Sequence, residues 1–263
     1  MRRRRSRSPV VVLGVAVALA AVGAGAAQGE LEQSGKLLAS FNGGIKPVAL
    51  PRVGKAPVAV SVRGDFKTTD GSFPDQLRQV IIGINRNGTL FDRGLPRCRR
   101  ESISPASPAE SLVECGGALV GRGHFSVQVD LPNQEPFPFE GTVRMFNSRG
   151  RSGTRLILAH LYGDTPPASF VLPFRIQRGR GTFGTRLVAT LPNAAAKWVH
   201  VIDYDLRLKR LFKSGGRQHS YLSAGCPVPA GYPGAVFPFA RVLYRFTGGK
   251  RISTTIVRNC RVR

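Results

Sequence analysis

Acidic residues are scarce in this sequence of 263 residues, which contains 15 Asp and Glu against 39 Lys and Arg. The shortage is uneven along the chain. Residues 28–140 hold 12 acidic and 13 basic residues, whereas residues 141–263 hold 3 acidic and 21 basic residues. The formal charge therefore rests mostly on the C-terminal half, which favours anionic partners but says nothing about the fold.

The motifs that mark common catalytic and metal sites are also missing. The four histidines have no H-E-x-x-H spacing, the cysteines form no C-x-x-C pair, and no G-x-S-x-G segment is present to expose a nucleophilic serine. One G-x-G-x-x-G match spans Gly179–Gly184, with Asp203 further along. Dinucleotide binding requires such glycines to open a helix, but here they lead into an alternating strand pattern. We predict a glycine-rich hairpin and no cofactor.

The N-terminus has the composition of a secretory signal peptide. Five arginines within residues 2–7 precede an uncharged run at residues 9–27, which ends in Ala24-Gly25-Ala26 and so matches the A-x-A cleavage pattern. We predict that residues 1–27 are removed and that the mature protein is secreted or lies at the extracellular surface. The alternative is that this segment is retained as a membrane anchor, because the run approaches the roughly 20 apolar residues that span a bilayer.

Four cysteines, Cys98, Cys115, Cys226 and Cys260, give an exported chain an even number of thiols. In an oxidising compartment this number favours disulfides over metal ligands. Among the possible pairings we predict Cys98 with Cys115 and Cys226 with Cys260, because each closes the shorter loop. In the chain-entropy description, each bridge stabilises the fold by roughly 3 to 4 kcal/mol.

Apolar residues alternate with polar ones in many short segments. A period of two indicates half-buried strands, and the Gly, Pro, Asn and Asp residues between the segments form turns. Segments of helical period do not separate the strands, which favours antiparallel pairing over βαβ units. The predicted strands are residues 58–62, 79–85, 117–131, 139–147, 154–162, 169–177, 182–191, 198–208, 236–247 and 251–258.

One short helix is expected inside the loop between Cys98 and Cys115, called the first cysteine loop below. Ser107 is suited to the N-cap, Pro108 to the first helical position and Glu110 to a capping box, while Gly116 is placed to end the helix. We therefore predict an all-β fold, an antiparallel β-sandwich of jelly-roll or Ig-like type with this single helix. We expect residues 56–263 to form one domain and residues 28–55, which lack a sustained period, to form a tether or loose N-terminal segment.

The basic C-terminal half contains the candidate binding residues. An anionic cell-wall polymer or an acidic polysaccharide would be attracted to such a charge, whereas the neighbouring aromatic residues are too few to indicate nucleic-acid binding. The alternative interpretation is a solvated sheet face, which most charge runs are. The candidate residues are Arg175, Arg178, Arg180, Arg207, Lys209, Arg210, Lys213 and Arg217.

A carbohydrate-active enzyme on a jelly-roll scaffold is a second hypothesis, and it requires Tyr204, His200 and His219 to converge. A purely structural surface domain is the third, and we favour a non-enzymatic protein. Strand 198–208 also carries Asp203 and Asp205 on one face. Because side chains alternate along a strand, we expect His200 to point to the opposite face, which argues against a metal site.

Several phrases of the sequence cover most of the mature chain. They are Gly94-Leu-Pro-x-Cys98, Cys115-Gly-x-Ala-Leu-Val-Gly-x-Gly123, Pro167-Ala-Ser-Phe-Val-Leu-Pro-Phe174, Gly181-x-Phe-Gly-Thr185 and Ser220-Tyr-Leu-x-Ala-x-Cys-Pro227. These phrases resemble an uncharacterised family of secreted proteins from high-GC actinobacteria, which has no established activity. The resemblance therefore implies a secreted or cell-surface location and a single structural unit, and it assigns no catalytic residue.

Overall fold

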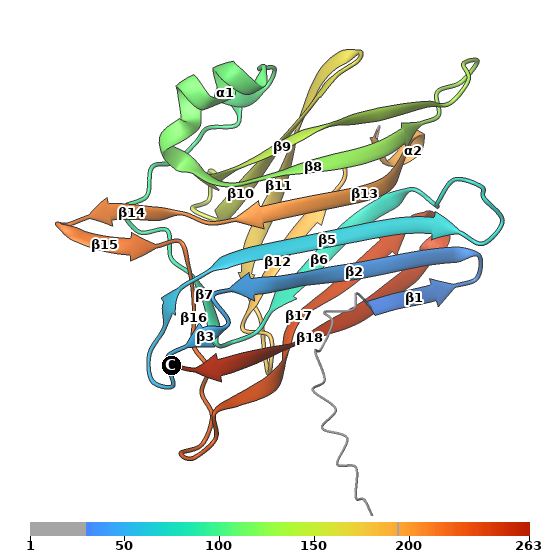
Figure 1. Ribbon diagram of the computed structural model, residues 1–263. Helices are drawn as coiled ribbons and strands as arrows, with labels where there is room; N and C mark the ends of the chain where they lie inside the picture. Colours follow the sequence, from blue (N-terminus) through green and yellow to red (C-terminus); the bar gives the residue numbers. More distant parts are fainter. Residues whose placement is uncertain (1–29, 194) are drawn as a thin grey trace, which may run out of the picture.

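A computed structural model describes residues 30–193 and 195–263 of the protein (Figure 1). The predicted signal peptide lies outside these described residues. Within them the chain is mostly strand, which confirms the all-β prediction. The strands are β1 (Glu30–Ser34), β2 (Leu37–Lys46), β3 (Ala49–Leu50), β4 (Ala56–Pro57), β5 (Ala59–Thr68), β6 (Leu77–Ile84), β7 (Gly88–Leu90), β8 (Leu119–Val129), β9 (Phe137–Arg149), β10 (Arg155–Asp164), β11 (Pro167–Arg178), β12 (Thr185–Thr190), β13 (Val199–Leu208), β14 (Leu211–Ser214), β15 (Arg217–Ser220), β16 (Leu222–Ala224), β17 (Gly234–Phe246) and β18 (Arg251–Val262).

Most of the strands belong to one curled, 13-stranded sheet (Figure 1). The described strands of this sheet are antiparallel to their neighbours, except that β3 runs parallel to β18. The strands follow one another without a break, so the predicted division into the two layers of a sandwich is not confirmed. Their order is β1-β2-β5-β13-β8-β9-β10-β11-β12-β6-β17-β18-β3.

The sheet curls until strands from its two ends meet. Strand β18 contacts both β1 and β2. The Thr254 hydroxyl donates a hydrogen bond to the Glu30 carboxylate across 3.1 Å, and the Arg258 guanidinium donates to the Asn42 side chain across 2.5 Å. Side-chain bonds therefore connect the two ends of the curl and enclose its apolar face.

The described part of residues 28–55, for which we predict a tether or loose N-terminal segment, instead contributes β1, β2 and β3 to the sheet. Strand β2 pairs with β5 from Leu37 opposite Thr68 to Lys46 opposite Ala59, and its residues Leu37 and Phe41 are fully buried. Alternation is visible in the sequence only as far as Phe41, because two glycines follow one residue later. Pairing with β5 extends the strand through these glycines, which is a tertiary effect on a segment of weak local preference.

The enclosed face carries the main core, which contains a group of aromatic rings. Phe66 contacts the rings of Tyr204, Tyr244 and Phe246. The hydroxyls of Tyr204 and Tyr244 lie 2.8 Å apart and share a hydrogen bond. Burial raises the pKa of both tyrosines, so both stay protonated and neutral.

A second, smaller core lies on the outer face, where the first cysteine loop covers β9, β10 and β11. It contains Phe146, Leu158 and Val171 from the sheet. Both predicted disulfides are confirmed, and the bond between Cys98 and Cys115 also belongs to this outer core. The helical elements are α1 (Pro108–Cys115), a single turn α2 (Ala195–Trp198), and the short 3₁₀ segments η1 (Glu101–Ile103), η2 (Gly116–Ala118) and η3 (Thr247–Gly249).

Helix α1 confirms the prediction from the first cysteine loop. The Ser107 side chain accepts a hydrogen bond from the Glu110 backbone, and the Glu110 side chain accepts one from the Ser107 backbone. The helix has Pro108 as its first residue and Gly116 as its C-cap. Local sequence therefore determines this element, and the disulfide attaches its last residue to the outer face.

The remaining strands form two small sheets. Strands β14 and β15 make a hairpin that projects from the body of the molecule (Figure 1). Strands β4, β16 and β7 form a three-stranded sheet. Leu90, Leu222 and Ala224 of this sheet belong to the main core, so the small sheet covers part of the apolar interior.

Gly64 tests the packing of the aromatic group. A Cβ atom at Gly64 would lie 2.6 Å from the ring of Tyr204 on the neighbouring strand. We expect Gly64→Ala to lower the free energy of unfolding by about 1 to 3 kcal/mol, because the ring has to move within a packed core. Gly116→Ala is the matched control, since a Cβ there meets nothing within 4 Å. Equal urea midpoints for the two variants would contradict this account of the core.

Candidate functional site

Three arginines on neighbouring strands form a row on the outer face of the sheet. Arg207 of β13 is directly opposite Arg122 of β8, and Arg122 is directly opposite Arg144 of β9. Their sequence neighbours Leu206, Leu208, Val143 and Met145 are buried in the main core, so the arginines point outward. Side chains opposite each other on adjacent strands lie about 5 Å apart at Cβ, and like charges in this arrangement are destabilising.

The arginine row, Arg207, Arg122 and Arg144, has little negative charge to offset it. Asp205 lies 3.9 Å from the Arg207 guanidinium. Among the described residues, Arg122 and Arg144 have no side-chain hydrogen bond or ion pair, and the Nη1 atom of Arg144 is buried without a partner. Burial and the neighbouring Arg122 lower the pKa of Arg144. A desolvated donor without an acceptor costs free energy, whereas an anion at the row would bind the exposed side chains of Arg122 and Arg207.

The predicted basic residues fall into two separate groups. Arg207 and Lys209 lie at the end of β13, Arg210 precedes β14, and Lys213 and Arg217 lie on the β14–β15 hairpin. This group continues the arginine row. The second group is Arg175, Arg178 and Arg180, exposed on β11 and the turn after it.

The two basic groups do not form the single field that the sequence suggested. Strands β8, β9 and β10 lie between β13 and β11, a separation of roughly 19 Å at about 4.8 Å per strand. The first cysteine loop also packs over β9, β10 and β11, between the groups. Sequence reasoning missed Arg122 and Arg144, because their place beside Arg207 depends on pairing between distant strands.

Acidic side chains occupy the same outer face as the arginine row. They lie two outward-facing positions further along the strands. Asp203 of β13 is directly opposite Asp65 of β5. Asp65 accepts hydrogen bonds from Ser40 across 2.9 Å and from Arg63 across 3.0 Å. Burial and the charge of Asp65 raise the pKa of Asp203. Within residues 30–193 and 195–263, no three or more His, Cys, Asp or Glu side chains are arranged to hold a metal ion.

The expectation that His200 faces away from Asp203 is wrong, because β13 contains a bulge. Val201 pairs with Val127 but Asp203 pairs with Ser126, so Ile202 is an extra residue. His200 consequently lies on the outer face, like Asp203. It donates from Nδ1 to the Pro74 carbonyl across 2.5 Å and its ring lies 5.4 Å from that of Phe73. Its role in the structure is to hold the loop before β6.

The structure does not bring together the three residues of the enzyme hypothesis. Tyr204 is inside the curl with Tyr244, whereas His200 is outside it. His219 lies on β15 beyond the far end of β13, and the strand from His200 to Leu208 alone spans roughly 25 Å at about 3.3 Å per strand residue. Its ring stacks on Phe91 at 4.9 Å, beside a shallow groove that is also lined by Lys55 and Gln218.

The segment Gly179–Gly184 forms the predicted hairpin between β11 and β12. The Gly179 backbone N–H donates to the Gly184 carbonyl across 2.9 Å. Gly184 leads directly into strand β12, which starts at Thr185. The helix that a dinucleotide site needs is therefore replaced by a strand at this position.

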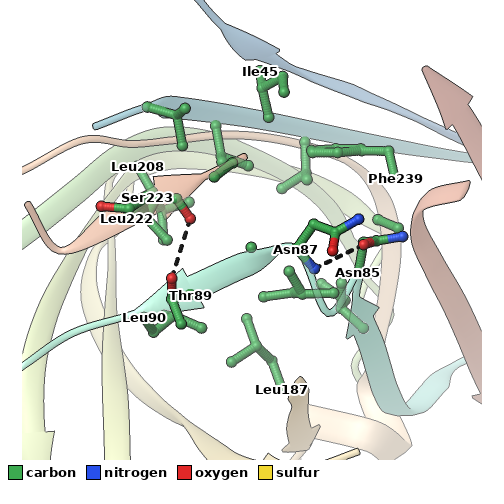
Figure 2. Close-up of a pocket in the computed structure, with 18 of the residues that line it drawn as sticks. Ile45, Asn85, Asn87, Thr89, Leu90, Leu187, Leu208, Leu222, Ser223 and Phe239 are labelled. Atoms are coloured by element: carbon green, nitrogen blue, oxygen red, sulfur yellow. Dashed lines mark hydrogen bonds between the residues drawn. The ribbon is translucent and has the colours of Figure 1, made fainter. Parts of the chain in front are cut away.

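A cavity of about 80 Å³ lies inside the curl (Figure 2). Its wall comes from both halves of the sheet and from the small sheet β4-β16-β7. Almost all of the lining surface is apolar. An empty apolar cavity of this volume costs the folded state about 2 kcal/mol at about 24 cal/mol per Å³. The lining residues include Ile45, Val60, Ile84, Phe174, Leu206 and Phe239.

The polar residues of the cavity wall lie on the side where β7 and β16 meet (Figure 2). The Asn85 amide donates to the Pro238 carbonyl across 2.7 Å, and its oxygen accepts from the Asn87 backbone N–H across 2.9 Å. The Thr89 hydroxyl donates to the Ser223 carbonyl across 3.4 Å. In the deep part of the cavity, a ligand would therefore make almost only apolar contacts.

Comparison of this chain with protein-family models, with curated proteins and with solved structures finds no significant match. Among the described residues, no helix is long and apolar enough to cross a membrane. The two disulfides are typical of proteins in an oxidising compartment.

Replacing the central arginine of the row should stabilise the protein. Arg122→Gln removes one charge between Arg207 and Arg144, so we expect the free energy of unfolding to rise by about 0.2 to 1 kcal/mol at low salt. Arg186→Gln is the charge-matched control, because Arg186 is opposite Gly83 and Gln177. Urea unfolding of both variants measures the difference, and a larger gain from the control would contradict repulsion within the row.

The raised pKa of Asp203 predicts that replacing this carboxylate stabilises the protein, by an amount that depends on pH. The folded state holds the Asp203 proton more tightly than the unfolded chain, so the ionised carboxylate destabilises the fold above this pKa. We expect Asp203→Asn to stabilise the protein at neutral pH, with the gain disappearing as the pH falls through the raised pKa. The control is Asp164→Asn, at an exposed position, and the measurement is urea unfolding across pH 3 to 7. A gain that persists unchanged at low pH would refute the electrostatic cause.

Proposed function

We propose that the protein is exported and binds an anionic polymer of the cell envelope at the outer face of β13, β8 and β9. The ligand is an anionic cell-wall polymer or an acidic polysaccharide, and the protein acts without catalysis. The observation that carries this proposal is the arginine row, in which three arginines lie directly opposite one another on neighbouring strands with little negative charge to offset them.

Electrostatics supports a ligand at the arginine row. Like charges in directly opposed positions oppose folding, so the sheet pays for this arrangement in stability. Carboxylate, sulfate or phosphate groups would relieve the repulsion and would accept hydrogen bonds from the planar guanidinium group. Arg122, in the centre of the row, would bind one anionic group of the ligand together with Arg207 or with Arg144.

The extent of the basic surface supports a polymer over a single small anion. Lys209 follows the end of β13 beyond Arg207, and Lys213 and Arg217 lie on the projecting β14–β15 hairpin (Figure 1). Arg210 is anchored beside them, since its guanidinium donates to the Gly117 carbonyl across 3.2 Å. A chain of repeated negative groups can contact several of these cations at once, which raises its affinity through multivalency.

The proposed location rests on three observations about the chain. The N-terminal residues have the pattern of a signal peptide, the two disulfides favour an oxidising compartment, and the sequence resembles secreted actinobacterial proteins. An envelope polymer is an abundant polyanion that an exported basic protein would encounter.

Salt elution from immobilised heparin and from purified wall polymer tests the binding site. We expect Arg122→Gln and Arg144→Gln to elute at clearly lower salt than the unchanged protein, because each loses a direct contact to the polymer. Arg251→Gln, at an exposed arginine of β18, is the charge-matched control and should elute close to the unchanged protein. Arg178→Gln tests the other basic group in the same way.

Two results would count against the polymer site. If the unchanged protein fails to bind either matrix at low salt, the basic surface is a solvated sheet face and not a polymer-binding site. Equal shifts for Arg122→Gln and Arg251→Gln would show that net charge alone determines retention. Circular dichroism and urea unfolding of each variant verify that a loss of binding does not come from a loss of folding.

A further inference from the structure

We infer that the cavity inside the curl is a binding site for a small, neutral, apolar molecule of at most about six carbon atoms. This site is independent of the arginine row, because it lies on the opposite face of the sheet. The protein would thus carry an apolar ligand in its interior while its outer face contacts the envelope.

The chemistry of the wall determines the class of ligand. Every residue that lines the cavity is uncharged, so an ionised group inside would be desolvated without a counter-charge. The polar group of Asn85 already has its partners in Pro238 and Asn87. Asn87, Thr89 and Ser223 line the cavity (Figure 2), but they open almost no polar surface to it, so the ligand would be bound by apolar contact alone.

The size of the cavity limits the ligand. The volume of about 80 Å³ is several times the roughly 10 to 15 Å³ that one water molecule needs. Water is disfavoured there, because it requires polar partners that the apolar wall does not provide, and an apolar cavity of about 150 Å³ binds benzene or xenon. The cavity of this protein has about half that volume, so a ligand of at most one six-membered ring has the right size and polarity.

The small sheet β4-β16-β7 is the thinnest part of the cavity wall. Thr89 and Ser223 line the cavity and also the outer groove beside His219, so these strands alone separate the two spaces. Strands β4 and β16 share only two paired positions, Ser223 with Pro57 and Ala224 with Ala56. Short strands with few ladder bonds open locally at low cost, which gives an apolar molecule a way into the interior.

Binding of fluorobenzene to the mature protein tests this site. We expect the ¹⁹F NMR signal of the probe to broaden and shift on addition of the unchanged protein, with saturation below millimolar concentration. The thermal midpoint should rise with probe concentration, because the probe binds the folded state alone. Ala240→Leu places added carbon atoms in the cavity and should abolish both effects.

Two controls separate a ligand site from an ordinary packing gap. Val257→Ala changes an exposed residue of β18 and should bind the probe as the unchanged protein does. Ala159→Leu adds the same atoms to the core away from the cavity and should lower the thermal midpoint, whereas Ala240→Leu should leave it equal or higher. Absence of binding by the unchanged protein, or undiminished binding by a folded Ala240→Leu variant, would overturn the proposal. Heparin elution of Ala240→Leu should be unchanged, so failure here is distinct from failure of the polymer site.

Discussion

The structure depends on the burial of one face of a long antiparallel sheet. A sheet with one apolar face has to cover that face, and here the sheet does so by curling until β18 reaches β1 and β2. Bonds from Thr254 to Glu30 and from Arg258 to Asn42 connect the two ends. The curl brings Phe41, Phe66 and Tyr244, from three separate strands, into one aromatic group. The N-terminal strands are therefore as necessary to the core as the C-terminal ones.

Because the inner face takes nearly all of the apolar residues, the outer face carries the charge. Its one large apolar area, around Phe146, Leu158 and Val171, is covered by the first cysteine loop, which the Cys98–Cys115 bond attaches. The remaining outer surface is divided by sign. The arginine row and the acidic pair Asp65 and Asp203 lie two rows apart along the same strands. This division gives the molecule a cationic end, to which the projecting hairpin adds further basic residues.

The curl also explains why the interior retains a cavity. Close packing at the aromatic end follows from large rings and from glycines such as Gly64, which makes room for Tyr204. At the other end most of the wall consists of aliphatic side chains, among them Val58, Val60 and Ala240, with Phe174 and Phe239 beside them, and the small sheet spans the remaining gap. The two proposed sites thus use opposite faces of the same strand, since Leu206 and Leu208 line the cavity while Arg207 between them belongs to the arginine row.

The sequence by itself determined the elements whose signals are local. The period of two located most strands of the large sheet from β5 to β18, but not the short strands β7, β14, β15 and β16. Ser107 and Glu110 located α1, and loop length was enough to pair the cysteines correctly. Tertiary structure alone decided the strand order and the place of β2 in the sheet. It also decided that Ile202 is an extra residue, which places His200 on the outer face. Finally, it decided that Arg122, Arg144 and Arg207 are neighbours. The physical reason is that periodicity and capping act between residues close in sequence, whereas register, bulges and cavities arise from contacts between strands that lie far apart in the chain.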